Sequence, residues 1–200
     1  MPEKTVQKEP GKKPAPSKKP KPQQEVVVQI SLSELHPFPD HPFQVREDAS
    51  MQETAESVKE YGVLVPALAR PREDGGYELI AGHRRKHACE LAGLATMPVI
   101  VRNIDRDAAT IIMVDSNLQR ENILPSERAK AYKMKMEAIK RQGARTDLTS
   151  PKISAKFRSD DEVGQDAGVS GDTIRNYIAL TQLVPELQQM VDEKKIALSP

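Results

Sequence analysis

The 200-residue sequence lacks tryptophan and has a single cysteine, Cys89. One cysteine excludes an internal disulfide and is typical of a protein that works in a reducing compartment. No apolar run approaches the roughly 18 residues that a membrane-spanning helix needs, and the basic N-terminus lacks the apolar segment of a signal peptide. Aromatic residues make up only 4% of the chain, so a core must be built mainly from aliphatic side chains. These absences predict a cytoplasmic protein with one or two modest domains.

Positive charge is distributed unevenly, although the net charge is only +1. Residues 1–24 contain seven lysines and two glutamates, a net charge of +5, which leaves −4 for the rest. This Lys/Pro-rich tail is expected to be disordered. A second basic stretch, residues 128–158, has ten lysines and arginines against Glu137 and Asp147. An excess of this size favours a polyanionic partner, with a solvated helix face as the alternative.

Residues 77–88 predict a strand that turns through one glycine directly into a helix. An apolar run over residues 77–81 is followed by Gly82 and then by residues with a helical period. Such a junction points backbone N–H groups and the positive end of a helix dipole at one place. Arg84, Arg85 and Lys86 lie in the first helical turn, where cations are unfavourable unless an anion binds there. The pattern indicates a phosphate site, although a solvated basic face would also carry these residues.

Apolar periodicity predicts a small α+β unit up to residue 104 and helices beyond it. Strands are expected at 26–30, 63–69, 77–81 and 97–101, and the first helix is expected to run from a Ser50 capping box to Tyr61. The helix after Gly82 should turn Ala88 and Leu91 inward. Later helices are expected over 105–114 and, capped by Ser126, over 126–143. The expected organisation is a tail (1–24), an α+β domain (25–104), a helical part (105–143) and a DNA-binding domain (144–200).

Residues 160–183 have the pattern of a helix-turn-helix. A short helix over 161–167 leads through Gly168 to a second helix that begins after Ser170 and turns Ile174 inward. Ser170 is expected to cap this second helix. The side chains that project from its early turns, the part that enters the major groove in such motifs, are Thr173, Arg175 and Asn176. The basic residues expected to contact DNA phosphates just before the motif are Lys152, Lys156 and Arg158.

Four segments in this order resemble the ParB/RepB/Spo0J family of partition proteins. They are residues 62–66 (Gly-Val-Leu-Val-Pro), 82–88 (Gly-His-Arg-Arg-Lys-His-Ala), 117–122 (Asn-Leu-Gln-Arg-Glu-Asn) and the helix-turn-helix. The resemblance covers residues 25–200. Residues 124–127 and 145–148 look most like members carried on Gram-positive mobile elements. The resemblance implies a mixed-sheet ParB/sulfiredoxin-like domain followed by an all-α helix-turn-helix domain.

The same resemblance implies a function. Family members bind a palindromic centromere-like DNA site as dimers, work with a ParA-type ATPase and associate with the nucleoid. Their N-terminal domain binds CTP with Mg²⁺ as a clamp-closing ligand. The nucleotide-binding residues that the resemblance implies here are Gln44, Arg46, Gly82, His83, Arg84, Arg85, Asn117, Gln119 and Arg120, with Asn117 also at the metal.

Three positions depart from the family pattern. Ser116 stands where the family usually has a glutamate that helps to hold magnesium, Val65 where a polar residue is common, and His83 where a glutamate is common. Asp115 is adjacent to Ser116, but one residue along a helix points about 100° away. Ser116 therefore argues against hydrolysis, and slow CTPase activity stays open. The family's C-terminal dimerisation domain has no counterpart here, so either the chain is truncated or the dimer forms differently.

Other functions use some of the same residues. A sulfiredoxin-like enzyme needs a cysteine where His83 stands, a small-molecule kinase needs Asp115 or Glu121 as its base, and a nuclease needs acids spaced for two metals, which are not evident. His83 and His87 could share a metal, but no third ligand is apparent. His36 and His41 are assigned no role. The main alternative is a transcriptional regulator or nucleoid-occlusion protein, which would use the same helix-turn-helix.

Overall fold

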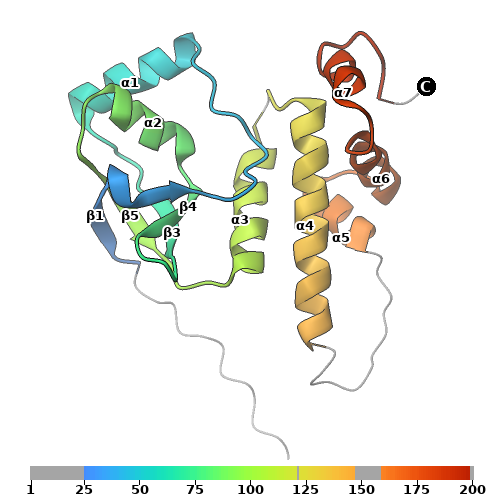
Figure 1. The fold of residues 1–200 in the computed structure, drawn as a ribbon, viewed down its shortest axis with the longest axis horizontal. Helices are drawn as coiled ribbons and strands as arrows, with labels where there is room; N and C mark the ends of the chain where they lie inside the picture. The colour runs from blue at the N-terminus through green and yellow to red at the C-terminus, as the bar shows by residue number, and fades with distance from the viewer. Residues whose placement is uncertain (1–24, 121, 147–158, 199–200) are drawn as a thin grey trace, which may run out of the picture.

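The computed structural model describes residues 25–120, 122–146 and 159–198. It shows an α+β domain joined through a long helix, α4, to a smaller helical domain (Figure 1). The tail over residues 1–24 lies outside the described residues. So do the expected phosphate contacts Lys152, Lys156 and Arg158.

A five-stranded mixed sheet in the order β1-β5-β3-β4-β2 forms the centre of the α+β domain. The pairs β1–β5 and β3–β4 are antiparallel, whereas β2–β4 and β3–β5 are parallel. The strands are β1 (Val27–Ser31), β2 (Leu35–Pro37), β3 (Ala67–Pro71), β4 (Tyr77–Ala81) and β5 (Thr96–Val101), with a 3₁₀ turn at Leu32–Glu34.

The strand expected at 63–69 begins only at Ala67. Leu64 and Val65 are 80% and 64% exposed, so the residues before Pro66 form a loop that has no apolar environment to hold it in the sheet. β2 was not among the strands expected from the sequence. It pairs with the outer side of β4 over three residues.

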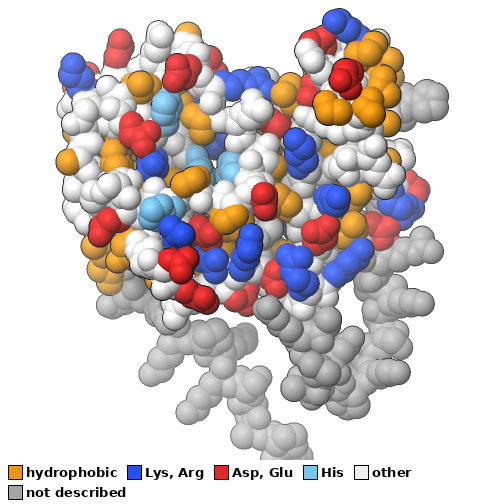
Figure 2. All heavy atoms as spheres, viewed as in Figure 1, with side chains coloured by type: hydrophobic (Ala, Val, Ile, Leu, Met, Phe, Trp, Pro, Cys, Tyr) orange, Lys and Arg blue, Asp and Glu red, His pale blue; other side chains and the backbone are white. Residues whose placement is uncertain are grey.

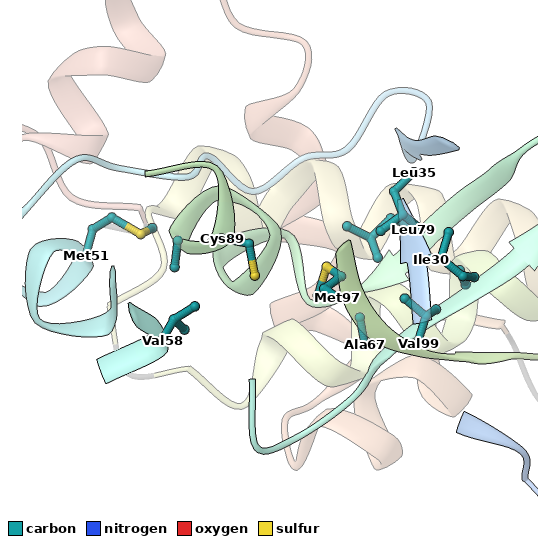
Figure 3. Close-up of a cluster of buried hydrophobic side chains, with 11 residues drawn as sticks. Ile30, Leu35, Met51, Val58, Ala67, Leu79, Cys89, Met97 and Val99 are labelled. Atoms are coloured by element: carbon teal, nitrogen blue, oxygen red, sulfur yellow. The ribbon is translucent and has the colours of Figure 1, made fainter. Parts of the chain in front are cut away.

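Helices α1 (Ala49–Tyr61) and α2 (His83–Leu91) cover one face of the sheet. Figure 3 shows their side chains meeting those of the strands in one apolar cluster, with members that include Met51, Val58, Cys89, Leu79 and Met97. Two expectations were wrong here. Asp48, not Ser50, caps α1, because its carboxylate accepts a hydrogen bond from the Met51 N–H at 2.9 Å. Leu91 is 52% exposed, because Ala88 and Cys89 are the α2 residues that reach the core.

Helix α3 (Arg106–Leu118) covers the other face, where Ile80 packs with Met113 and Val114. Asp105 caps α3 by accepting from the Ala108 N–H at 2.8 Å. The helix was expected to end at residue 114 but continues for another turn, which places Asn117 on it. Helix α4 (Pro125–Thr146) packs against α3. It begins and ends beyond the expected limits, and Ser126 is not its cap.

The helical domain consists of α5 (Ser159–Ala167), α6 (Gly171–Leu180) and α7 (Pro185–Asp192), all packed on α4. Val163 and Ile174 are fully buried against Tyr132 of α4, which is the expected inner face of a helix-turn-helix. Ser170 caps α6 as expected, accepting from the Thr173 N–H at 3.1 Å. The α+β fold with a helix-turn-helix is therefore confirmed. Across the described ranges, we find no helix with the length and apolar character needed to span a membrane.

Candidate functional site

The junction between β4 and α2 has the predicted strand–glycine–helix geometry. Gly82 has φ of 110°, a conformation that side-chain-bearing residues rarely adopt. A Cβ at this position would lie 2.8 Å from the Cβ of Ala67 in β3, so the close packing also requires glycine. The Gly82 carbonyl accepts the first helical hydrogen bond, from the Lys86 N–H at 2.9 Å. The unpaired N–H groups at the start of α2 consequently lie beside the arginines of its first turn.

Arg84 and Arg85 do not extend freely into solvent. The Arg85 guanidinium donates to the carbonyls of Val65 and Pro66, both at 2.6 Å. The Arg84 guanidinium donates to the Ser50 hydroxyl at 3.1 Å and lies 3.7 Å from the Asp48 carboxylate. The two arginines thus link the start of α2 to the loop before β3 and to the start of α1.

Arg120, just beyond the end of α3, belongs to the same cluster of cations. Partial burial lowers the pKa of Arg120, and the positive charges of Arg84 and Arg85 lower it further, while Glu127 acts in the opposite direction. Three guanidinium groups close enough to perturb one another repel in the absence of an anion. A bound anion would relieve this repulsion, and the sequence predicts an anion at this place.

His83 lies against His41, a contact that the sequence did not reveal. The two ring centroids are 3.9 Å apart with the planes tilted by 45°. Burial, and then the charges of His41 and Arg120, lower the pKa of His83 to about 3. Burial likewise lowers the pKa of His41. Figure 2 shows histidine side chains gathered on the face of the α+β domain, with Lys and Arg side chains nearby.

Asn117 is 3% exposed, and its side-chain N–H₂ donates to the Met113 carbonyl at 2.8 Å. Its Oδ1 is buried and accepts no hydrogen bond. Buried polar atoms without a hydrogen-bond partner are rare in folded proteins, and a bound ligand, ion or water can supply such a partner. Among the described residues three side-chain atoms are in this state: Asn117 Oδ1 and the Nε2 atoms of His41 and His83. All three belong to residues around Arg120.

The neighbours of Asn117 offer little to a metal ion. The Ser116 hydroxyl donates to the Met113 carbonyl at 3.0 Å. Asp115 accepts from Lys135 at 2.7 Å, on the side of α3 that faces α4. The part of the chain that the structure describes contains no group of three or more His, Cys, Asp or Glu residues placed to hold a metal. Asn117 Oδ1 could contribute one oxygen to a magnesium ion, with the remaining ligands coming from phosphates and water.

The remaining sequence-predicted nucleotide residues divide into two groups. Gln44 and Arg46 have exposed side chains on the loop before α1. The Gln44 backbone N–H donates to the Glu127 carboxylate at 3.1 Å, so this loop is held to the start of α4. Gln119 instead lines a cavity of about 490 Å³ between α3, α4 and α5, on the side toward the helix-turn-helix.

The second predicted site lies on the early turns of α6. Arg175 and Asn176 are exposed and Thr173 is half-buried, with its hydroxyl 2.9 Å from that of Ser170. The Arg175 guanidinium is held by the carboxylates of Asp160 in α5 and Asp172 in α6. An arginine held in this way is pre-oriented rather than free.

Several alternatives from the sequence lose support. Cys89 lies in the core, and burial raises the pKa of its thiol, which disfavours the reactive thiolate form. Asp115, proposed as a kinase base, is paired with Lys135, and Glu121 lies outside the described residues. His87 lies 3.4 Å from both Glu47 and Glu90, whereas His83 faces His41, so these two histidines do not converge on one metal.

Two residues that contact the candidate site were not expected from the sequence. His41 was assigned no role and Glu127 was read only as part of a family motif, because their partners, His83 and Gln44, are far away in the sequence. The sequence feature that could have pointed to His41 is its place in a proline-rich segment between two phenylalanines, Phe38 and Phe43, which are both buried.

The comparison with known proteins settles the family. The model of the ParB N-terminal domain matches residues 16–118, about half of the chain. The chain belongs to the ParB family. Among its ParB-type relatives is the chromosome-partitioning protein Spo0J of Thermus thermophilus, 34% identical over 171 residues, which are 85% of this chain and 56% of that protein. A nucleoid occlusion protein of Halalkalibacterium halodurans is 30% identical over 87% of this chain and 55% of its own length.

A solved ParB structure has the same fold. The C-terminally truncated ParB of Caulobacter crescentus, complexed to the centromeric parS site, aligns with a TM-score of 0.56 and 26% identity over 86% of this chain and 80% of that one. The chain spans about half the length of the curated ParB relatives it matches. The ParB resemblance found in the sequence is therefore confirmed.

Proposed function

We propose that this chain is a ParB-type partition protein that binds CTP at the arginine cluster and reads a palindromic centromere-like site with α6. The observation that carries the nucleotide half is that three residues around Arg120 each have a buried side-chain atom without a hydrogen-bond partner. A triphosphate with its base and ribose presents both acceptors and donors, which can satisfy such atoms together with the guanidinium groups. The clustered guanidinium groups support binding of an anion, and CTP is the choice that the family implies.

Within this pocket the residues take different parts. The N–H groups after Gly82, with Arg84 and Arg120, bind phosphate oxygens, while Arg85 holds the loop that closes one side. Exposed Gln44 and Arg46 reach the base and ribose. Asn117 Oδ1 contacts a magnesium ion, which would neutralise phosphate charge when bound. We do not assign Gln119 a phosphate contact, because it lines the cavity toward α5.

The structure offers little chemistry for hydrolysis. Ser116 is engaged with the Met113 carbonyl, and Asp115 with Lys135. We therefore propose that CTP acts as a binding ligand that is hydrolysed slowly or not at all.

The DNA half rests on α6, since its capped N-terminus presents Arg175 and Asn176. Support comes from the Caulobacter crescentus ParB that was solved on parS. The proposal has three further parts. The protein works as a homodimer, it acts with a ParA-type ATPase, and it associates with the nucleoid in the cytoplasm. The Lys/Pro-rich residues 1–24 are the proposed contact for the ATPase, and their deletion should reduce its stimulation. Unchanged ATPase stimulation would discard that role.

Isothermal titration calorimetry with CTP and magnesium tests the pocket. Wild type should bind, and Arg84→Ala should bind at least about tenfold more weakly, because a charge-assisted phosphate contact is lost. Lys59→Ala, at an exposed position on α1, is a matched control that removes a cation away from the cluster and should bind like wild type. Equal binding by Arg84→Ala and wild type would remove the assignment.

A nucleoid-occlusion role is the second candidate, favoured by the Halalkalibacterium halodurans relative. It uses the same pocket and reader, so the two roles differ in the DNA site and partner. Genome-wide mapping of the bound sites separates them: a cluster near one locus indicates partition, and dispersed sites indicate occlusion.

A further inference from the structure

The His41–His83 pair has a feature that phosphate binding by arginines does not explain. The loop that carries His41 is fixed, because Phe38 and Phe43 on either side of it are 3% and 4% exposed. His41 Nδ1 lies 2.7 Å from the Phe43 carbonyl oxygen. A carbonyl can only accept, so Nδ1 carries the proton, and in the neutral ring Nε2 is a bare acceptor.

His83 and His41 lie so close together that both rings cannot be protonated at once. The His83 ring lies 3.9 Å from that of His41, centroid to centroid, and both Nε2 atoms are buried without a partner. Two imidazolium rings at that separation would repel strongly in a partly buried site. The pair is thus either neutral or singly protonated.

The charges that face the pair come from several elements. Arg120 after α3 acts on both rings, Glu127 of α4 acts on His41, and Lys86 of α2 acts on His83. His83 also lines a cavity of about 310 Å³ whose other titratable members are Glu47, Lys86, His87 and Glu90. Burial and the nearby cations lower the pKa of both histidines, that of His83 to about 3.

A bound polyphosphate reverses this balance. Its negative charges would lie on Arg84 and Arg120, and Arg120 is the cation common to both rings. A bare Nε2 lone pair beside phosphate oxygens is repulsive, whereas an Nε2–H is a charge-assisted donor. Protonation would also let at least one of the two Nε2 atoms, which have no hydrogen-bond partner, donate to a phosphate oxygen.

We propose that the stacked His41–His83 pair takes up one proton when a polyphosphate binds beside Arg120, so that the chain holds nucleotide more tightly as the pH falls. This inference rests on the proposed nucleotide function and assigns a proton-binding element within that same pocket. The sign follows from linkage: a ligand that raises a pKa binds more tightly at lower pH. The gain begins below the pKa of the bound state and is complete below that of the free state.

Calorimetry with CTP and magnesium in two buffers of different ionisation enthalpy counts the protons taken up. The nucleotide's own γ-phosphate also titrates, so the measured quantity is the difference between wild type and His83→Gln. Wild type should take up about one proton more per CTP, and between pH 8 and pH 6 its affinity should rise up to about tenfold per pH unit more than that of the variant. His36→Gln is the matched control. His36 lines a separate cleft with Arg72 and Asn103, and the variant should behave like wild type.

Three outcomes are distinguishable. Extra proton uptake by wild type alone supports the pair. Binding of CTP with the same uptake in wild type and His83→Gln overturns this inference and leaves the nucleotide function standing, whereas no binding by wild type overturns both. Should His83→Gln fail to fold, wild type with ¹³C-labelled histidine rings answers the question by NMR. One ring must shift from neutral to protonated on CTP addition at pH 7, and unchanged rings refute the proposal.

Discussion

Arg84 and Arg85 are neighbours in sequence but have different roles. The Arg85 guanidinium holds two backbone carbonyls at 2.6 Å and is half-buried, so it fixes the loop before β3. Arg84 makes one hydrogen bond, to an exposed serine on α1, and has more freedom to exchange that partner for a phosphate. At the scale of residues, position in the first helical turn identifies Arg84 and Arg85 as candidate phosphate-binding residues. Their contacts then favour Arg84 as the one that binds the proposed ligand.

Arg85→Ala should therefore lower stability as well as nucleotide affinity. Loss of two hydrogen bonds from a charged donor is expected to reduce the free energy of unfolding by about 1.5–3 kcal/mol, while Arg84→Ala should change it by less than about 0.5 kcal/mol. Urea unfolding followed by circular dichroism gives both values. Equal stability of the two variants would show that the Val65 and Pro66 contacts carry no weight.

Gly82→Ala is expected to destabilise the domain through two independent effects. A positive φ is strained for alanine, and the added Cβ would meet Ala67 at 2.8 Å. Together these should lower the free energy of unfolding by about 2–4 kcal/mol. Gly93→Ala is the matched control, because its φ is 72° but no atom lies within 4 Å of the added Cβ. If both substitutions proved equally mild, close packing at the β4–α2 junction would be excluded as a requirement.

Buried Lys135 connects three helices at the scale of elements. This α4 side chain is 1% exposed and donates to Asp115 of α3 and Asp166 of α5, at 2.7 and 2.8 Å. Burial alone would lower the pKa of Lys135, but the hydrogen bonds to the two carboxylates raise it above its ordinary value. The carboxylates are about half exposed, so water can solvate them if the lysine is removed.

The order of mutant stabilities should reflect that asymmetry. Lys135→Met fills the same space and is expected to change the free energy of unfolding by less than about 1 kcal/mol. Asp115→Ala combined with Asp166→Ala leaves a buried ammonium unpaired and should lower it by about 3–5 kcal/mol. Chemical unfolding curves of the variants check this order, and the reverse order would contradict a buried charged lysine.

Gly164 sets the packing of the helix-turn-helix. A Cβ there would lie 2.6 Å from the Val169 carbonyl oxygen. Because that oxygen belongs to backbone, Gly164→Ala should separate α5 from the turn and weaken binding to every duplex, with CTP binding retained. Gln165→Ala, exposed on the same helix, is the control. Electrophoretic mobility shifts on specific and random duplexes measure the effect, and full DNA affinity in Gly164→Ala would show that the turn tolerates the change.

Replacing Arg175, which we propose reads bases, should give a different result. Arg175→Ala should lose about 1–3 kcal/mol of binding to the specific site and little on random DNA, so specificity falls. Fluorescence anisotropy on both duplexes distinguishes this from the uniform loss expected of Gly164→Ala. If Arg175→Ala weakened binding equally on the specific and the random duplex, Arg175 would contact phosphates and not bases.

Elements with strong local signals were predictable from the sequence, whereas contacts between distant segments were not. The β4–Gly82–α2 junction and the Ser170 cap follow from residue type and spacing, and both were confirmed. β2 has three residues and a proline, so its pairing with β4 depends on tertiary context. The Lys135 contacts join residues 20 and 31 positions apart, and His41 meets His83 through folding alone, so neither leaves a sequence pattern.

Helix α4 joins the two halves of the molecule. At its start the Ser126 N–H and hydroxyl donate to Asp192 of α7, at 2.9 and 2.5 Å, and Glu127 holds the Gln44 loop. Arg128 lies over the Tyr177 ring of α6, 5.8 Å from its centroid. The first turn of α4 therefore contacts both the loop that carries Gln44 and the helix-turn-helix domain, a physical link through which the two proposed sites would be coupled.

The most direct test of this account is CTP affinity measured with and without a saturating parS duplex. Calorimetry with magnesium should give an affinity that the duplex changes by at least about fivefold, and by reciprocity CTP should change DNA affinity by the same factor. Arg84→Ala should abolish the CTP response while still binding DNA. An identical CTP affinity in both conditions, or no CTP binding at all, would contradict a nucleotide pocket coupled to a DNA reader.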